Sequence, residues 1–249
     1  MQAYRMIPFQ MFDAFTNMAL DEVIVERVRS GDSLPTIRFY GWQPSAISIG
    51  IFQGIHNEVN LDKAKAAGVD VVRRQTGGGA VYHAAGGEIT YSIIGSVNLF
   101  PANILKSYEV ICGDIVFALK NLGLEAHFAP INDILVQEQK ISGSAQTRRN
   151  GILLQHGTVL YQTDIEKIEH LLNVSQEKTS DKLIKSVKKR VTWIQELCGA
   201  SLDDLKLALE QSFSRERWIE IGGYTTQEIE QAGKLVKEKY TTNAWNYRL

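Results

Sequence analysis

Three consecutive glycines follow a pair of arginines in residues 73–83, which read RRQTGGGAVYH. Glycine lacks a Cβ, so Gly77, Gly78 and Gly79 can adopt positive φ and let a ligand approach the backbone closely. Their N–H groups can converge on an anion, and Arg74 can add charge-assisted bonds to phosphate or carboxylate. A flexible β-turn is the alternative, but the arginines and His83 favour an anion-binding loop. The spacing matches neither a GxxxxGK[ST] phosphate loop nor a GxGxxG segment that opens a helix.

A lysine among small residues marks the second segment, in which Lys140 precedes ISGSAQ. Gly143 and the serines beside it leave room for a ligand to approach the ammonium group. Such an ammonium can hold a carboxylate and a phosphate while the charge between them changes. The alternative is an edge-strand lysine that prevents aggregation.

His156 and Gly157 lie in an alternating run, LLQHGTVL, that is typical of a strand. A lone histidine in such a run is more often a hydrogen-bonded core residue than a catalyst, and the glycine again removes bulk. No serine or cysteine is marked as a nucleophile by its spacing. Cys112 falls on an apolar helical stripe and Cys198 follows a helix end, so we expect both to be structural.

The elements that must position these residues can be read from periodicity and stop signals. Asp13 is a candidate N-cap of a helix that runs to residue 29 and ends at Gly31. A capping box, Thr225 with Glu228, opens the last helix. We expect strands at 36–40, 45–51, 69–73, 89–94, 133–136, 140–143 and 152–161, and helices at 61–67, 104–122, 164–172, 201–213 and 225–240. The fold class is therefore α+β, a mixed sheet flanked by helices, and residues 1–249 are expected to form one domain whose part after about residue 164 is mainly helical.

Composition excludes several classes of protein. The 249 residues carry 27 Lys plus Arg against 28 Asp plus Glu, so a protein built to coat nucleic acid is disfavoured. Two unclustered cysteines disfavour a disulfide framework and a structural zinc site. No signal peptide or membrane span is apparent, so we expect a cytoplasmic protein. A basic run, Lys182, Lys185, Lys188, Lys189 and Arg190, is read as a solvated face or as a surface that steers an acidic protein partner.

Together, RRQTGGGAVYH and NDILV…KISGSAQTRR…LLQHGTVL resemble the lipoate–protein ligase A family, its relatives the lipoyl and octanoyl transferases and, more distantly, the biotin–protein ligases. The likeness extends to residues 16–22 (TNMALDE), 38–42 (RFYGW) and 240–247, and so covers nearly the whole chain. It implies a mixed sheet with an apolar acyl tunnel over it. In the ligases, lipoate and MgATP give lipoyl-AMP, and the acyl group then passes to one lysine of a lipoyl carrier.

The resemblance also implies roles for individual residues. Lys140 would be the catalytic residue, holding the carbonyl and phosphate oxygens. The lipoyl-AMP or ATP would be wrapped by Arg74, Gly77, Gly78, Gly79, Ala80, Val81, Tyr82, Lys140 and, more loosely, Arg148, and the lipoate pocket would contain His83, Gly143, His156 and Gly157. ATP and Mg²⁺ would be the cofactors and lipoate the substrate, with metal ligands unassigned. An acyl adenylate needs cationic screening, backbone donors and exclusion of water more than it needs a nucleophile.

Three departures bear on the subfamily. His83 is followed by Ala84 rather than by the Asp that many family members carry, which casts doubt on a metal or nucleotide role for that position. The chain stops after the Trp245 segment, as in the split ligases whose accessory domain is a separate polypeptide. The ends also look like those of the octanoyltransferases, which use a cysteine shortly before the 133–140 region. Residues 127–133, HFAPIND, hold no cysteine, so the sequence favours the ATP-dependent ligase.

Two other hypotheses stay open. One is an ATP-independent transferase that moves octanoyl or lipoyl groups between carriers, and the other is a non-catalytic paralogue that binds lipoyl carriers or free lipoate. In each case the expected partner is a lipoyl carrier, either a lipoyl domain or a protein like that of the glycine-cleavage system. A separate accessory subunit is also a candidate partner, whereas nucleic acid and membranes are not expected.

Overall fold

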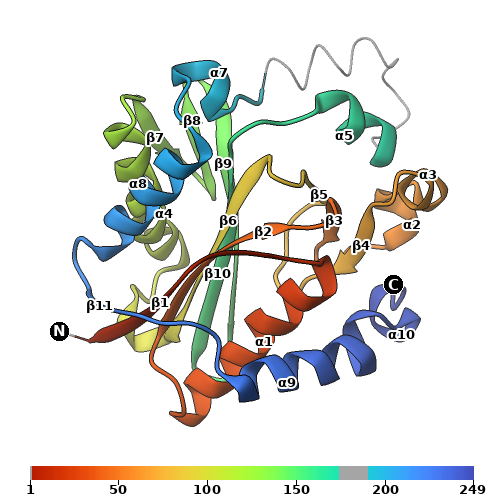
Figure 1. Cartoon of the computed structure of the whole chain (residues 1–249), viewed down its shortest axis with the longest axis horizontal. Coiled ribbons are helices and arrows are strands. Elements are labelled where there is room, and N and C mark those ends of the chain that lie inside the picture. The colour runs from red at the N-terminus through yellow and green to blue at the C-terminus, as the bar shows by residue number, and fades with distance from the viewer. Residues whose placement is uncertain (1, 174–189) are drawn as a thin grey trace.

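A large mixed sheet runs through the middle of the molecule, and a smaller sheet lies beside it (Figure 1). The structure is a computed structural model that describes residues 2–173 and 190–249. The large sheet has the order β11-β1-β2-β6-β10-β9-β8-β7 and the small one the order β4-β3-β5. Strand β1 is parallel to both of its neighbours, β11 and β2, and β3 is parallel to β4, whereas the other pairings are antiparallel. This mixed α+β architecture confirms the expected fold class.

The strands of the large sheet are β1 (Ala3–Phe12), β2 (Thr36–Trp42), β6 (Glu88–Ser96), β7 (Ala126–Ala129), β8 (Asp133–Val136), β9 (Gln139–Arg149), β10 (Ile152–Leu160) and β11 (Trp218–Ile221). Those of the small sheet are β3 (Ala46–Ile49), β4 (Asp70–Arg73) and β5 (Val81–His83). The helices are α1 (Ala14–Ser30), α2 (Ile55–Glu58), α3 (Leu61–Ala66), the 3₁₀ turn η1 (Val97–Leu99), α4 (Ile104–Asn121), α5 (Ile165–Leu171), α7 (Ile194–Cys198), α8 (Leu202–Ser214), α9 (Thr226–Leu235), the π turn η2 (Val236–Tyr240) and α10 (Asn243–Asn246).

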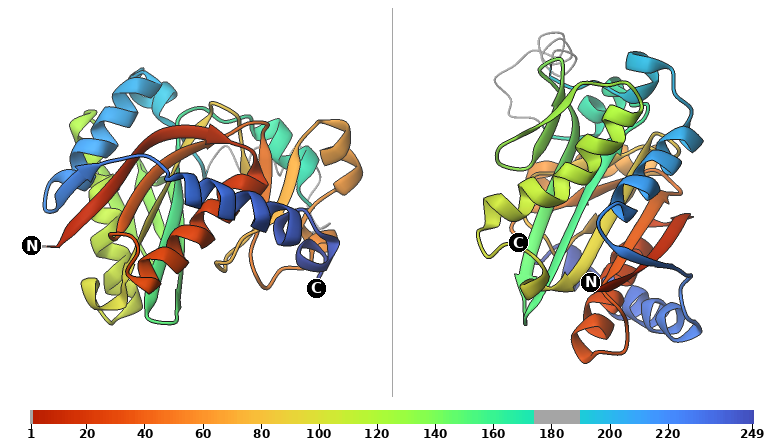
Figure 2. Two further views of the ribbon diagram at one scale, coloured as in Figure 1. Left: turned by 60° about the horizontal axis from the view of Figure 1, so that its bottom comes forward. Right: turned by 90° about the vertical axis from the view of Figure 1, so that its left-hand side faces the viewer.

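Helices cover both faces of the large sheet. Helices α4 and α8 pack together on one face, where Ile111 and Phe213 join sheet residues such as Tyr91 in the largest buried cluster. Helix α1 lies on the other face, and α9 runs beside it (Figure 2). Buried apolar area stabilises these layers by roughly 25 cal/mol per Å².

Helix α1 carries part of the site, and its ends follow from sequence. The Asp13 side chain accepts a hydrogen bond from the Thr16 N–H, and Gly31 ends the helix with φ of 83°. Both expectations for this helix are confirmed, as is the capping box of Thr225 and Glu228 on α9. The face of α1 toward the sheet buries the polar residues Asn17 and Asp21 among apolar ones.

Four strands were missed, namely β1, β5, β7 and β11. Strand β1 contains Pro8, which masks its pattern; β5 adjoins the glycine run; and β11 is short and largely exposed. The expected strand at 140–143 is also too short, because β9 continues to Arg149 through polar residues that pair with β10. The expectation that residues 1–249 form a single domain stays a prediction.

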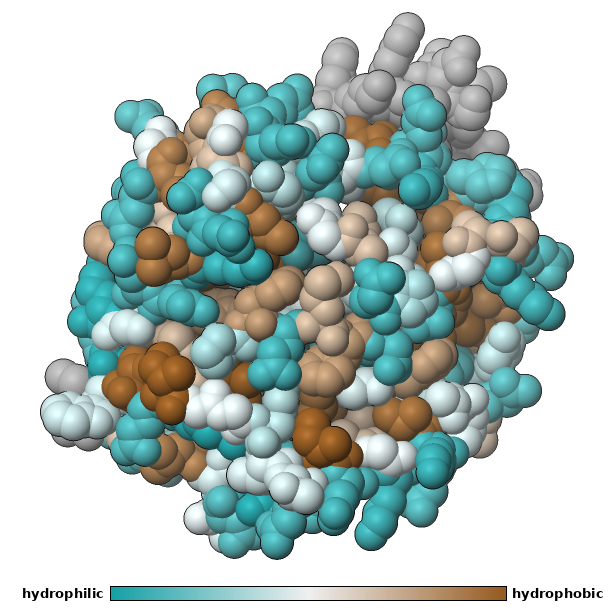
Figure 3. All heavy atoms as spheres, viewed as in Figure 1, coloured by the Kyte–Doolittle hydropathy of each residue, from teal (hydrophilic) through white to brown (hydrophobic). Residues whose placement is uncertain are grey.

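The surface is mainly hydrophilic on the face seen in Figure 3, where hydrophobic residues occur as several separate patches. In the described part of the chain, no helix combines the length and apolar character needed to cross a bilayer. Lys182, Lys185, Lys188 and Lys189 of the basic run lie outside the described residues, and Arg190 is exposed.

Candidate active site

A cavity of about 320 Å³ lies where the small sheet meets β9 and β10 of the large one. Its walls combine aromatic and aliphatic side chains with a few polar groups, which is typical of a ligand site. The lining residues are Met18, Tyr40, Trp42, Ser48, Arg74, Gly78, Gly79, Ala80, Val81, Tyr82, His83, Thr90, Asn132, Lys140, Gly143, Ser144, Ala145, His156, Gly157, Thr158, Leu160, Thr163, Ile168, Leu172 and Val191.

The triglycine loop forms one wall of this cavity, and Arg74 holds it from behind. Gly78 has a backbone φ of 94°, which residues with a side chain rarely adopt. Arg74 Nη2 donates to the carbonyls of Gly77 at 2.7 Å and Gly79 at 2.8 Å. Gly50 packs so closely that a Cβ there would be 2.2 Å from the Gly78 carbonyl oxygen. The loop is therefore held by hydrogen bonds from Arg74 and by close packing against Gly50.

The guanidinium of Arg74 has five N–H donors, and all five have hydrogen-bond partners. Besides the two loop carbonyls, Nε donates to Thr76 Oγ1 at 3.1 Å, and Nη1 donates to Ser48 at both its carbonyl oxygen (3.0 Å) and its Oγ (3.2 Å). Burial lowers the pKa of Arg74 to about 10, so the group stays charged at neutral pH. Arg74 therefore orders the loop and contributes positive charge, while the loop N–H groups are left to meet a ligand.

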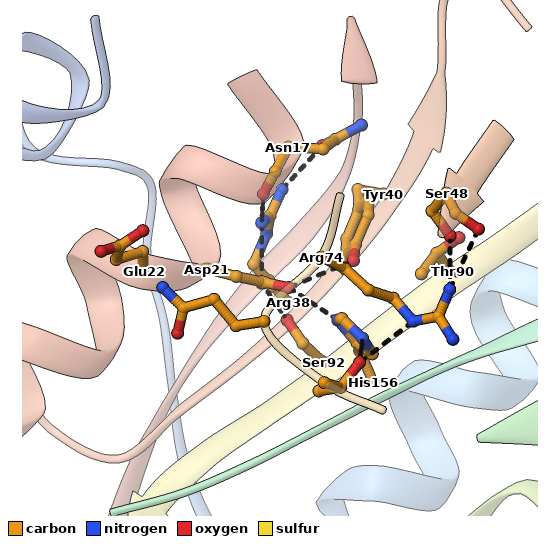
Figure 4. A network of polar contacts seen from close by, with 12 residues as sticks. Asn17, Asp21, Glu22, Arg38, Tyr40, Ser48, Arg74, Thr90, Ser92 and His156 are labelled. Carbon is orange, nitrogen blue, oxygen red and sulfur yellow. Dashed lines mark hydrogen bonds and ion pairs between the residues drawn. The ribbon is translucent and has the colours of Figure 1, made fainter. Parts of the chain in front are cut away.

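A buried polar network connects this arginine to helix α1 (Figure 4). Asp21 accepts hydrogen bonds from Arg38 Nη1 at 2.9 Å and from Ser92 Oγ at 2.8 Å, and its other oxygen lies 3.0 Å from His156 Nδ1. The other ring nitrogen of His156 lies 2.7 Å from Thr76 Oγ1. The chain of contacts thus runs from Arg38 to the triglycine loop.

The charges in this network follow from burial and pairing. Burial alone would raise the pKa of Asp21, but Arg38, His156 and Ser92 together lower it. Burial is the largest influence on His156 and lowers its pKa, although Asp21 opposes the shift. His156 is therefore neutral at pH 7, with its proton on Nδ1 toward Asp21 and with Nε2 accepting from Thr76.

A second chain of contacts surrounds His83, which is stacked on Trp42 with ring centroids 3.9 Å apart. His83 Nε2 lies 2.9 Å from Ser48 Oγ, and Nδ1 lies 2.6 Å from Glu88 Oε1. Thr90 Oγ1 donates to the same Glu88 oxygen at 2.8 Å and accepts from Trp42 Nε1. These groups are buried, but Ser48 and His83 line the cavity.

Lys140 adds a second positive charge to the residues that line the cavity. Its Nζ lies 2.7 Å from Asp133 Oδ1, and both side chains are partly exposed, at 40% and 33%. Gly143 makes this position possible, because a Cβ there would be 2.7 Å from the Lys140 ammonium. Lys140 and the triglycine residues Gly78 and Gly79 line the same cavity.

Most of the residues suggested by the sequence come together in this cavity. Arg74, Gly78, Gly79, Ala80, Val81, Tyr82, His83, Lys140, Gly143, His156 and Gly157 all line it. Gly77 is not a lining residue but belongs to the same loop. Arg148 does not line the cavity, and its guanidinium instead donates to Gln146 and to the carbonyls of Pro101 and Ala102. The roles assigned to all these residues stay predictions.

Four functional candidates were missed in the sequence: Asp21, Ser48, Thr76 and Glu88. For Asp21 there was a signal, because Asn17 and Asp21 are one helical turn apart within an otherwise apolar stripe. Ser48 and Glu88 have no such signal, since their relation to His83 arises only when β3, β5 and β6 are assembled. Among the described residues, no group of three or more His, Cys, Asp or Glu side chains is placed to hold a metal ion, and no metal ligand is assigned.

The family is decided by a comparison with known protein families. Residues 13–214 match the model of the lipoyl protein ligase A/B catalytic domain. The chain belongs to this family. The members of this family are enzymes that transfer lipoyl and octanoyl groups. The resemblance seen in the sequence is confirmed.

Relatives that match over the full length of the chain indicate the subfamily. The chain is 32% identical to the octanoyltransferase LipM of Halalkalibacterium halodurans and 33% identical to that of Kyrpidia tusciae, each alignment covering 100% of both chains. Among solved structures of the family, it is similar to the bi-partite lipoate protein ligase of Thermoplasma acidophilum, with a TM-score of 0.88 and 32% identity over 99% of this chain and 96% of that one. A lipoate-protein ligase A bound with ATP matches with a TM-score of 0.84 and 30% identity over 99% of each chain.

The expectation of an ATP-dependent lipoate–protein ligase is wrong. The full-length relatives at 31–33% identity are octanoyltransferases of the LipM type. The expectation depended on the missing cysteine in residues 127–133, and one absent nucleophile in one segment does not identify an ATP-dependent enzyme. The structure also shows why Cys112 is no substitute: its side chain is fully buried, and burial raises its pKa to about 11.

Proposed function

We propose that the protein transfers an octanoyl or lipoyl group from a thioester on one carrier protein to a specific lysine of a lipoyl carrier domain, without ATP. The observation that carries this proposal is the full-length similarity to octanoyltransferases of the LipM type. A thioester is already activated, so the transfer to an amine proceeds without nucleotide. We place the reaction in the cytoplasm.

The cavity suits a medium-length acyl chain. Met18, Trp42, Leu160, Ile168 and Leu172 supply apolar surface next to the polar groups. Each methylene removed from water contributes about 0.8 kcal/mol, so an octanoyl chain gains several kcal/mol by entering. An acyl chain seated against these walls would displace water from the cavity, which would protect the acyl group from hydrolysis.

The polar groups suit the charge that develops during acyl transfer. Attack on a thioester places negative charge on the carbonyl oxygen, and donors fixed in advance stabilise that charge. Within the described residues, the N–H groups of Gly77, Gly78 and Gly79 donate to no other group. Gly78, Gly79 and Lys140 line the same cavity, and we assign the N–H groups of these two glycines and the Lys140 ammonium this role.

The proposed acceptor is a lipoyl domain or a protein like that of the glycine-cleavage system. The Thermoplasma acidophilum ligase, which this chain resembles over nearly its whole length, was studied with its E2 lipoyl domain. We place the approach of the carrier lysine beside Lys140, because this cavity-lining side chain is partly exposed, at 40%.

The test is transfer of an octanoyl group from an octanoylated carrier to an unmodified lipoyl domain, followed by mass spectrometry of the intact acceptor. We expect the acceptor to gain one octanoyl group in the absence of nucleotide, and Lys140→Ala to lower the rate at least about tenfold while keeping the fold. Acyl transfer that occurs only with free fatty acid and MgATP would refute the proposal.

A further inference from the structure

Ser48, His83 and Glu88 are arranged as a hydroxyl, an imidazole and a carboxylate in hydrogen-bonded series. Ser48 Oγ lies 2.9 Å from His83 Nε2, and His83 Nδ1 lies 2.6 Å from Glu88 Oε1. This is the relationship by which a base activates a hydroxyl nucleophile and a carboxylate orients the base. Strands β3, β5 and β6 supply one member each.

Hydrogen bonds around the series fix the direction of its protons. Glu88 accepts at Oε1 from both Thr90 and His83, so the His83 proton lies on Nδ1 and its Nε2 is an acceptor. Ser48 Oγ accepts from Arg74 Nη1 at 3.2 Å, which leaves its own proton to point at His83. Stacking on Trp42 holds the imidazole plane in place.

Access to the cavity distinguishes Ser48 from the other hydroxyl placed in this way. Thr76, His156 and Asp21 form a similar series, with separations of 2.7 and 3.0 Å. Both hydroxyl residues are buried, but Ser48 lines the cavity and Thr76 does not. The series ending at Thr76 therefore supports the loop, and the series ending at Ser48 can meet a substrate.

Neither cysteine competes with Ser48 for this role. Cys112 lies on α4, on the far side of the large sheet, where its sulfur contacts Ser144 and Gln155. Cys198 ends α7 and its sulfur donates to the Ile194 carbonyl, and neither residue lines the cavity. Within the described residues, Ser48 is the hydroxyl nucleophile of the cavity that has both a base and an orienting carboxylate.

We propose that Ser48 accepts the acyl group as an oxygen ester, so that the enzyme passes it from donor to acceptor in two steps. This inference rests on the proposed transfer reaction. In the first step Ser48 Oγ attacks the thioester carbonyl while its proton moves to His83 Nε2. The carbon–sulfur bond then breaks, and the leaving thiolate takes that proton.

The second step returns the enzyme to its starting state. The amine of the carrier lysine attacks the Ser48 ester and gives a proton to His83. The bond between the carbonyl carbon and Ser48 Oγ breaks as the amide forms, and His83 returns the proton to Ser48. No oxidant, metal or nucleotide is consumed. Because the acyl group waits on the enzyme, the two carriers can use one docking site in turn.

The experiment traps the first step by mixing enzyme with an octanoyl thioester in the absence of an acceptor. We expect a burst of thiol equal to the enzyme concentration and one octanoyl group on the peptide that contains Ser48. The adduct should resist neutral hydroxylamine, which cleaves thioesters but leaves oxygen esters intact. Ser48→Ala should abolish the adduct and slow transfer at least about a hundredfold.

Two variants separate chemistry from folding. Ser48→Cys should carry the acyl group as a thioester, and its adduct should become sensitive to neutral hydroxylamine, which a purely structural serine would not produce. Ser142→Ala removes another buried serine hydroxyl, one that has no hydrogen-bond partner and lies outside the cavity, and should leave the burst unchanged.

Several results would overturn the inference while leaving the proposed function in place. These are an adduct on Cys112, Cys198 or Thr76, unchanged transfer by Ser48→Ala, or wild-type transfer with no burst and no adduct. A wild-type enzyme that transfers no acyl group from any carrier thioester would instead count against the proposed function.

Discussion

Gly143 and Lys140 occupy neighbouring space in β9: a Cβ on Gly143 would lie 2.7 Å from both Cε and Nζ of Lys140. Real Cβ atoms do not approach other heavy atoms this closely. The position of the ammonium beside Asp133 therefore depends on a residue without a side chain, three places along the same strand.

Gly143→Ala should displace the Lys140 ammonium and leave the fold intact. The clashing atoms are the end of a flexible side chain, which can swing aside at little cost in stability. We expect octanoyl transfer to fall about tenfold or more, as charge stabilisation at the carbonyl oxygen is lost, with a melting temperature close to that of the wild type. An alanine variant with full activity would show that the position of Lys140 does not matter.

Gly157→Ala should behave differently, because its Cβ would meet atoms that cannot move. It would be 2.7 Å from the Gly143 carbonyl oxygen and 2.8 Å from the Tyr91 ring. Overpacking of this kind costs about 1–3 kcal/mol. Urea titration should show that loss of unfolding free energy, and a variant as stable as the wild type would contradict the packing seen in β10.

Arg74→Lys should loosen the triglycine loop. An ammonium has three donors and cannot reach Thr76, Ser48 and the two loop carbonyls together. We expect a loss of about 1–3 kcal/mol in stability and a lower transfer rate, since hydrogen bonds from a charged group are removed. Arg148→Lys is the matched control, because Arg148 also donates to backbone carbonyls but lies outside the cavity. Equal effects of the two substitutions on transfer would remove the special role of Arg74.

The pH dependence of the free energy of unfolding should reveal the lowered pKa of His156. Burial lowers its pKa in the folded state below the usual 6.5, whereas the unfolded chain retains that usual value. As the pH falls through 6.5, the unfolded state binds a proton before the folded state does, so the free energy of unfolding decreases. Denaturant titrations between pH 8 and 5 should show a steeper loss for wild type than for His156→Gln. Parallel curves would mean that His156 does not titrate differently in the two states.

The sequence predicted the elements with strong local signals. Asp13 and Gly31 bound α1 because a cap and a left-handed glycine act within one turn of the chain. Strand β11 had no comparable signal: it is four residues long, and it forms because β1 offers an unpaired edge far away in sequence. Local sequence signals predict the ends of helices well, but they do not predict which strands pair when the strands are far apart in the sequence.

The same distinction applies to the site. The triglycine loop, Lys140 and His156 could be found because glycine runs and isolated charged residues in apolar segments are unusual in any context. The partners of these residues could not be found in this way. Ser48 is an ordinary strand serine, and its relation to His83 exists only because β3 and β5 pair with Ala46 opposite His83. The prediction of a ligase rather than a transferase was wrong for a related reason, since it depended on the absence of a cysteine from residues 127–133 alone.

Intact-mass analysis of a lipoyl domain, incubated with the enzyme and an octanoylated carrier from which all nucleotide has been removed, tests the central claim most directly. We predict that the lipoyl domain gains one octanoyl group on a single lysine, and that added MgATP does not change the rate. An acceptor that stays unmodified until free octanoate or lipoate and MgATP are supplied would contradict the proposed function.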